Sequence, residues 1–160
     1  MITAPDRPRD RSIRDLAHEA LGFFTHTLLA VVLLGCVLGV MTINHPDPNS
    51  PEPKVVATVL AFLVPMFGGL IFSRFQRHST ARYVWISGLV VFTVVSVWVL
   101  DLPTGVGLCE HCGSVEKIWR TFFSFTHGSG LISGDGPLIG AWIPLAMVSY
   151  AFGARFGLEP

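Results

Sequence analysis

The sequence contains few charged residues. Asp, Glu, Lys and Arg together make up 14% of its 160 residues, hydrophobic residues make up 51%, and the mean hydropathy is +0.57. Soluble domains ordinarily contain about 25% charged residues. The shortage of charge therefore argues against a soluble globular domain and indicates a membrane protein.

Charged residues are also missing from the interiors of four long apolar stretches. A stretch of about 18 apolar residues is long enough to cross a bilayer as a helix. We expect transmembrane helices at residues 21–43, 55–72, 83–100 and 137–156. Transporters and proton pumps normally keep ionisable residues inside their spans. The sequence therefore disfavours ion-coupled transport and predicts an all-α, polytopic fold, with residues 1–160 forming a single membrane domain.

Arginine is unevenly distributed over the segments that flank these stretches. The N-terminal segment 1–20, the turn after the second stretch and the C-terminal end hold eight arginines, whereas the opposite side has only Lys54, Lys117 and Arg120. Such basic flanks are retained in the cytoplasm. We expect both termini to be cytoplasmic in a bacterial inner membrane, with segment 101–136 outside. No basic surface with interleaved aromatic residues supports nucleic-acid binding.

Cysteine is scarce, and two of the three cysteines form the Cys-x-x-Cys step Cys109 to Cys112 in segment 101–136. In an oxidising compartment the pair is expected to form a structural disulfide. A redox-active dithiol is a second interpretation. A zinc or copper site completed by His111 and His127 is a third. Haem attachment of the c type is excluded, because Gly113 stands where that motif requires histidine.

The plan of four spans with both termini inside resembles, in outline, the DsbB and vitamin K epoxide reductase families of membrane thiol oxidoreductases. The resemblance implies that Cys109 and Cys112 would exchange disulfides, with a quinone bound among the spans. The DsbB pattern places the cysteine pair in the first outer loop, here residues 44–53, which contain none. The reductase pattern places it at the mouth of the last span, whereas residues 113–136 intervene here. The sequence departs from both patterns.

Segment 114–126 has the pattern of a short amphipathic helix in the outer loop between the third and fourth spans. Apolar residues recur at steps of three and four, and Glu116 and Arg120 have the spacing of an ion pair. One expectation is that this helix lies flat at the membrane interface, with Trp119 and Phe122 at the acyl boundary. The other is that its aromatic stripe packs on the spans or on a partner protein.

The first apolar stretch carries three further signals. Ser12 and Asp15 match a capping box, which predicts a helix start near Ile13. His26 is expected to satisfy its hydrogen bonds with the adjacent threonines, and ligation of a haem or pigment is the alternative. Gly35 and Gly39 form a Gly-x-x-x-Gly step that permits close approach of another helix.

Abundant helix-contact signals and missing catalytic charges favour a non-enzymatic function. The leading hypothesis is a small accessory or assembly subunit of a larger membrane complex, which contacts the lipid bilayer and other membrane subunits and docks through Trp119 and Phe122. A thiol-disulfide oxidoreductase and a metal-binding membrane protein are the alternatives. No motif selects a cofactor among zinc, copper, haem, pigment and quinone.

Overall fold

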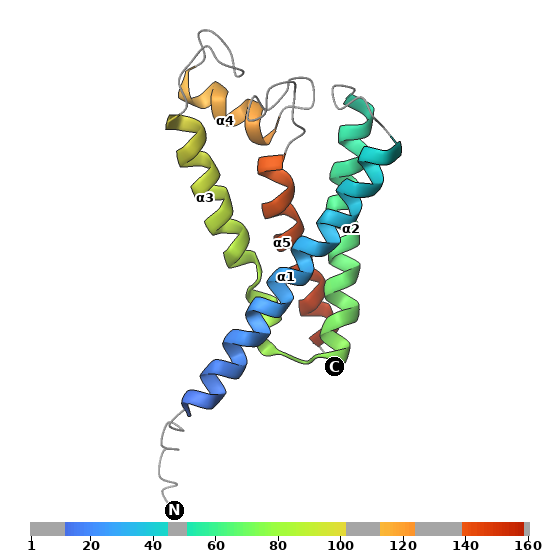
Figure 1. Ribbon diagram of the computed structural model, residues 1–160, viewed down its shortest axis with the longest axis vertical. Helices are drawn as coiled ribbons and strands as arrows, with labels where there is room; N and C mark the ends of the chain where they lie inside the picture. The colour runs from blue at the N-terminus through green and yellow to red at the C-terminus, as the bar shows by residue number, and fades with distance from the viewer. Residues whose placement is uncertain (1–11, 45–50, 102–112, 124–138, 159–160) are drawn as a thin grey trace, which may run out of the picture.

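The computed structural model is a bundle of helices (Figure 1) and describes residues 12–44, 51–101, 113–123 and 139–158. In these ranges there is no β-strand, and the prediction of an all-α fold is confirmed for them. The elements are α1 (Ile13–Asn44), α2 (Pro51–Phe75), the 3-10 helix η1 (Ser79–Tyr83), α3 (Trp85–Asp101), α4 (Ser114–Phe122) and α5 (Ile139–Leu158).

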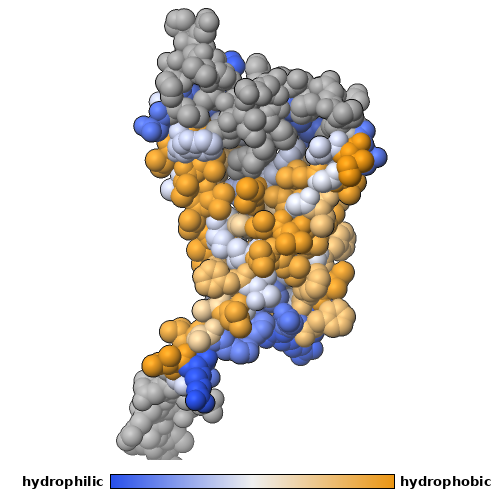
Figure 2. All heavy atoms as spheres, in the orientation of Figure 1, coloured by the Kyte–Doolittle hydropathy of each residue, from blue (hydrophilic) through white to orange (hydrophobic). Residues whose placement is uncertain are grey.

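Three helical segments among the described residues are long and apolar enough to cross a membrane: Ile13–Asn44, Lys54–Phe75 and Ser79–Asp101. They correspond to the first three predicted spans. The fourth predicted span is helical as α5, but α5 is not among the segments that meet this standard. Figure 2 shows a band of hydrophobic residues across the middle of the visible face of the bundle, which we call the apolar belt. These features are compatible with a small membrane protein whose helices contact lipid.

The start of α1 follows the predicted capping box. The main-chain N–H of Ser12 donates to Asp15 Oδ2 at 3.3 Å, and the N–H of Arg14 donates to Ser12 Oγ at 3.3 Å. With 32 residues, α1 is about 48 Å long, which exceeds the roughly 30 Å of a hydrocarbon core. Its first turns project beyond the rest of the bundle (Figure 1) and carry the exposed Ile13 and Leu16.

The helix α5 contacts all the other helical elements and packs most extensively against α2. Its buried residues join two clusters. One cluster joins α5 to α1, η1 and the residue after η1, and it contains Ala30, Ala81, Val84, Met147, Tyr150, Ala151 and Ala154. The other joins α5 to α1 and α2, and it contains Leu34, Ala57, Ala61, Trp142 and Ala146. Small side chains dominate both clusters, which lets the helix axes approach closely.

Glycines bring the backbones of α2 and α5 into direct contact. A Cβ atom built on Gly153 would overlap the main-chain oxygen of Met66, and one built on Gly69 would overlap the main-chain oxygen of Tyr150. A backbone oxygen cannot move aside as a flexible side chain can. Glycine is therefore required at both positions if the two helices are to keep their separation.

The short helix α4 lies over the end of α3, as Figure 1 shows. Its predicted ion pair is present, with Arg120 Nη2 at 2.7 Å from Glu116 Oε1. Phe122 is buried, and its ring lies 4.6 Å from that of Phe92 on α3, measured between centroids. Trp119 remains 59% exposed. The location of α4 at a membrane interface stays a prediction.

The substitution Gly153→Ala tests the contact between α2 and α5. We expect it to lower the free energy of unfolding by about 2 kcal/mol, because an extra methyl group forces the two backbones apart. Denaturant titration in detergent micelles, followed by circular dichroism, measures the change. Gly39→Ala is the matched control, because a Cβ there meets nothing within 4 Å. Equal stability of the two variants would contradict the close contact.

Candidate functional site

The predicted cysteine site lies outside the described residues. This holds for Cys109 and Cys112 and also for His111 and His127, so the disulfide, redox and metal interpretations all remain predictions. In the part of the chain that the structure describes, no group of three or more His, Cys, Asp or Glu side chains could hold a metal ion. Cys36 on α1 is an exposed free thiol.

The side chain of His26 is buried in the bundle and forms a hydrogen bond with a residue of α5, a helix far from it in the sequence. The side chain is 1% exposed, and its Nδ1 lies 2.6 Å from the hydroxyl oxygen of Tyr150 on α5. The expectation that neighbouring threonines satisfy this histidine is wrong. Thr25 donates to a main-chain carbonyl of its own helix, and Thr27 pairs with Ser87 on α3. A buried imidazole needs a polar partner, and α5 supplies it.

A second histidine, His78, reaches into the bundle beside His26. The ring of His78 lies 4.9 Å from that of His18 and 5.9 Å from that of His26, measured between centroids. Gly22 makes the space for it, since a Cβ on Gly22 would come within 2.8 Å of the His78 ring. The rings of His18, His78 and His26 are therefore neighbours in this order, and we call them the histidine row. Tyr150 extends the row through its hydrogen bond to His26.

Sequence reasoning missed this row, although part of its signal was present. His18, Gly22 and His26 recur at steps of four and so share one face of α1. Nothing local to α1 showed that His78, from the segment after α2, would fill the gap over the glycine. Nε2 of His26 is buried without a hydrogen-bond partner among the described residues, and the main chain of Gln76 lies near the ring.

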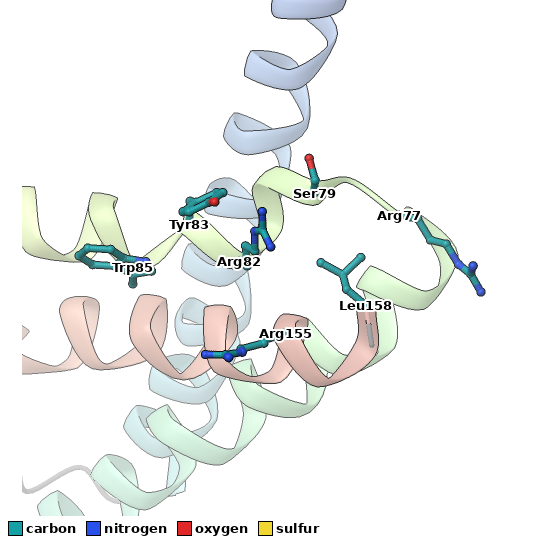
Figure 3. Close-up of a pocket in the computed structure, with 7 residues that line it drawn as sticks. All are labelled: Arg77, Ser79, Arg82, Tyr83, Trp85, Arg155 and Leu158. Atoms are coloured by element: carbon teal, nitrogen blue, oxygen red, sulfur yellow. The ribbon is translucent and has the colours of Figure 1, made fainter. Parts of the chain in front are cut away.

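An open pocket of about 760 Å³ lies between η1 and the end of α5. Figure 3 shows the described residues that line it. Three of them are arginines, and none is acidic: Arg77, Ser79, Arg82, Tyr83, Trp85, Arg155 and Leu158. We call this the arginine pocket.

Two arginines of the arginine pocket come from facing segments. Arg82 belongs to η1 and Arg155 to the last turns of α5, whereas Arg77 points away from the other labelled side chains (Figure 3). The guanidinium carbon of Arg82 lies 4.8 Å from the ring centroid of Tyr83. A cation–π contact of this kind favours one position of the guanidinium over the aromatic face. The arrangement is suited to binding an anion with several oxygen atoms.

A smaller, apolar cavity of about 380 Å³ lies among α3, α4 and α5. Its lining includes Phe92, Phe122 and Trp142. Trp142 is itself held in place, because its Nε1–H donates to Thr58 Oγ1 on α2 at 2.8 Å. Thr58 also lines this cavity, and the other described lining residues are apolar or aromatic.

The predicted helix-contact residues occupy different environments. Gly35 and Gly39 face outward from α1, and a Cβ at either position meets nothing within 4 Å. Trp119 is exposed on α4, whereas Phe122 is buried within the chain's own fold. Gly35, Gly39 and Trp119 are therefore accessible for contacts with another protein, and the side chain of Phe122 is largely covered.

No protein family matches the chain, and neither a curated protein nor a solved structure does.

The bond between His26 and Tyr150 can be tested with Tyr150→Phe. We expect a loss of about 2 kcal/mol in the free energy of unfolding, because the substitution leaves a buried imidazole nitrogen without its partner. Tyr83→Phe is the control, since Tyr83 is exposed and is the only other tyrosine. Chemical denaturation in micelles measures both variants. If Tyr150→Phe were no less stable than Tyr83→Phe, the hydrogen bond between His26 and Tyr150 would contribute nothing to the free energy of unfolding.

Proposed function

We propose that the protein is a small integral membrane protein of four spans, which serves as an accessory or assembly subunit of a larger membrane complex. In this proposal α5 is the fourth span. Its 20 residues give a length of about 30 Å, which equals the thickness of a typical hydrocarbon core.

The distribution of residues on α5 supports this assignment. Ser149 and Tyr150, which lower the hydropathy of α5, are buried against neighbouring helices. Apart from Arg155 in the last turn, the residues that α5 exposes in the same region are apolar: Val148, Phe152 and Phe156. A helix whose polar groups face protein and whose apolar groups face outward can cross a bilayer even when its average hydropathy is modest.

The orientation in the proposal follows from the arginines. Four arginines lie near one end of the bundle, in the last turn of α2, just after α2, in η1 and in the last turn of α5: Arg74, Arg77, Arg82 and Arg155. Arg120 on α4 is paired with Glu116. The positive-inside rule then places both termini in the cytoplasm and α4 on the outer side. Within this proposal the membrane is a bacterial inner membrane.

One observation carries the subunit role: the Gly-x-x-x-Gly step of α1 is open. Gly69, Gly88 and Gly153 are all in close contact with a neighbouring helix, but Gly35 and Gly39 contact none. Large apolar side chains would contact lipid better than glycine does, and glycine lowers helix stability by about 1 kcal/mol relative to alanine. Two glycines on an open face are therefore suited to the close approach of a helix from another chain.

The double substitution Gly35→Leu with Gly39→Leu tests the partner contact. We expect the isolated protein to stay folded, since both positions have space, and to lose its partner, because two leucines block close helix approach. Blue-native electrophoresis after mild solubilisation, with identification of co-purifying chains, measures the assembly.

The control for this experiment is Val94→Phe, which enlarges an exposed residue on α3 instead. The control should migrate with the wild-type assembly. A wild-type protein that migrates as a monomer without partners would contradict the proposal, as would an assembly that survives the double substitution.

A further inference from the structure

The arginine pocket lies at the edge of the apolar belt. Figure 2 shows hydrophilic residues gathered directly below the hydrophobic band at the end where η1 and the end of α5 lie in Figure 1. Tyr83 and Trp85, which line the pocket, are 41% and 43% exposed. Partly exposed tyrosine and tryptophan next to arginine are typical of the level of lipid headgroups.

The donors of the pocket match a phosphate group. Arg82 and Arg155 line the pocket from two different elements, and a guanidinium group can donate two parallel hydrogen bonds to phosphate oxygens. Ser79 adds a hydroxyl group to the lining.

The surface above the pocket is suited to an acyl chain. Leu89 follows Trp85 by four residues and therefore lies on the same face of α3. Leu89 is 54% exposed. The partly exposed Trp85 and Leu89 beside a basic pocket suit a molecule with a phosphate at one end and hydrocarbon at the other. A free inorganic anion would contact only the pocket.

We propose that the arginine pocket binds the phosphate-bearing headgroup of an anionic phospholipid. The proposal rests on the membrane-spanning part of the function proposed above and does not need the partner contact at Gly35 and Gly39. Basic pockets between membrane helices bind such headgroups by the same combination of charge and hydrogen bonding.

The test uses the full chain in nanodiscs of phosphatidylcholine with a minor fraction of phosphatidylglycerol. Native mass spectrometry then measures how strongly phosphatidylglycerol is enriched among the lipids that stay bound. We expect clear enrichment on the wild-type protein. Arg82→Gln and Arg155→Gln should each lower it about fivefold, because each removes one basic contact to the headgroup.

Arg14→Gln and Arg74→Gln are matched controls, because they remove exposed arginines that do not line the pocket. Both should leave the enrichment essentially unchanged. If the controls lowered it as much as the pocket variants do, diffuse charge attraction would explain the binding and the proposal would be overturned. Wild-type protein without any enrichment would overturn it as well.

Two further measurements separate a built lipid site from other causes. Arg82→Lys keeps the positive charge but cannot donate two parallel hydrogen bonds as a guanidinium group does. Its phosphatidylglycerol enrichment should therefore lie between those of the wild-type protein and Arg82→Gln. Enrichment equal to that of the wild-type protein would contradict a built site. Excess inorganic phosphate, at an ionic strength matched with chloride, should displace no phosphatidylglycerol. Displacement would identify a free-anion site instead.

The Gly35→Leu, Gly39→Leu variant should keep its lipid enrichment, which separates this proposal from the subunit role.

Discussion

The contact between the backbones of α2 and α5 is the constraint on which the other features depend. Gly69 and Gly153 allow this contact, because any side chain there would strike a main-chain oxygen of the opposite helix. With α5 held at the centre, Tyr150 reaches His26, and Arg155 comes opposite η1. The buried hydrogen bond and the arginine pocket are thus two consequences of where α5 lies.

The same constraint explains how a moderately apolar helix fits within an apolar belt. The buried side chain of Tyr150 on α5 is directed at α1, where its hydroxyl group forms a hydrogen bond with His26. Association of helices in lipid depends on such packing and polar contacts, because burial of apolar surface gains little there.

The sequence alone predicted the features that depend on residues close together in the chain. Apolar stretches predicted the helices, Ser12 and Asp15 predicted where α1 begins, and the spacing of Glu116 and Arg120 predicted their ion pair. It did not predict the contacts between segments that are far apart in the chain. The Gly-x-x-x-Gly step of Gly35 and Gly39 on α1 is open, whereas Gly153 and Gly157 on α5, which have the same spacing, make internal contacts with α2. A motif on one helix does not identify its partner. For the same reason, the sequence could not show that Tyr150 is the partner of His26 or that Arg82 and Arg155 line one pocket.

The central claim is that α5 crosses the membrane beside α2, and labelling at its two ends tests it most directly. In a chain whose three native cysteines are replaced by serine, a single cysteine is placed at Val115, on α4 before α5, or at Leu158, at the end of α5. An impermeant maleimide is then added to intact spheroplasts. The account predicts that Val115→Cys is labelled at once and that Leu158→Cys is labelled only after the membrane is permeabilised. Labelling of both positions from the same side of an intact membrane would contradict the account.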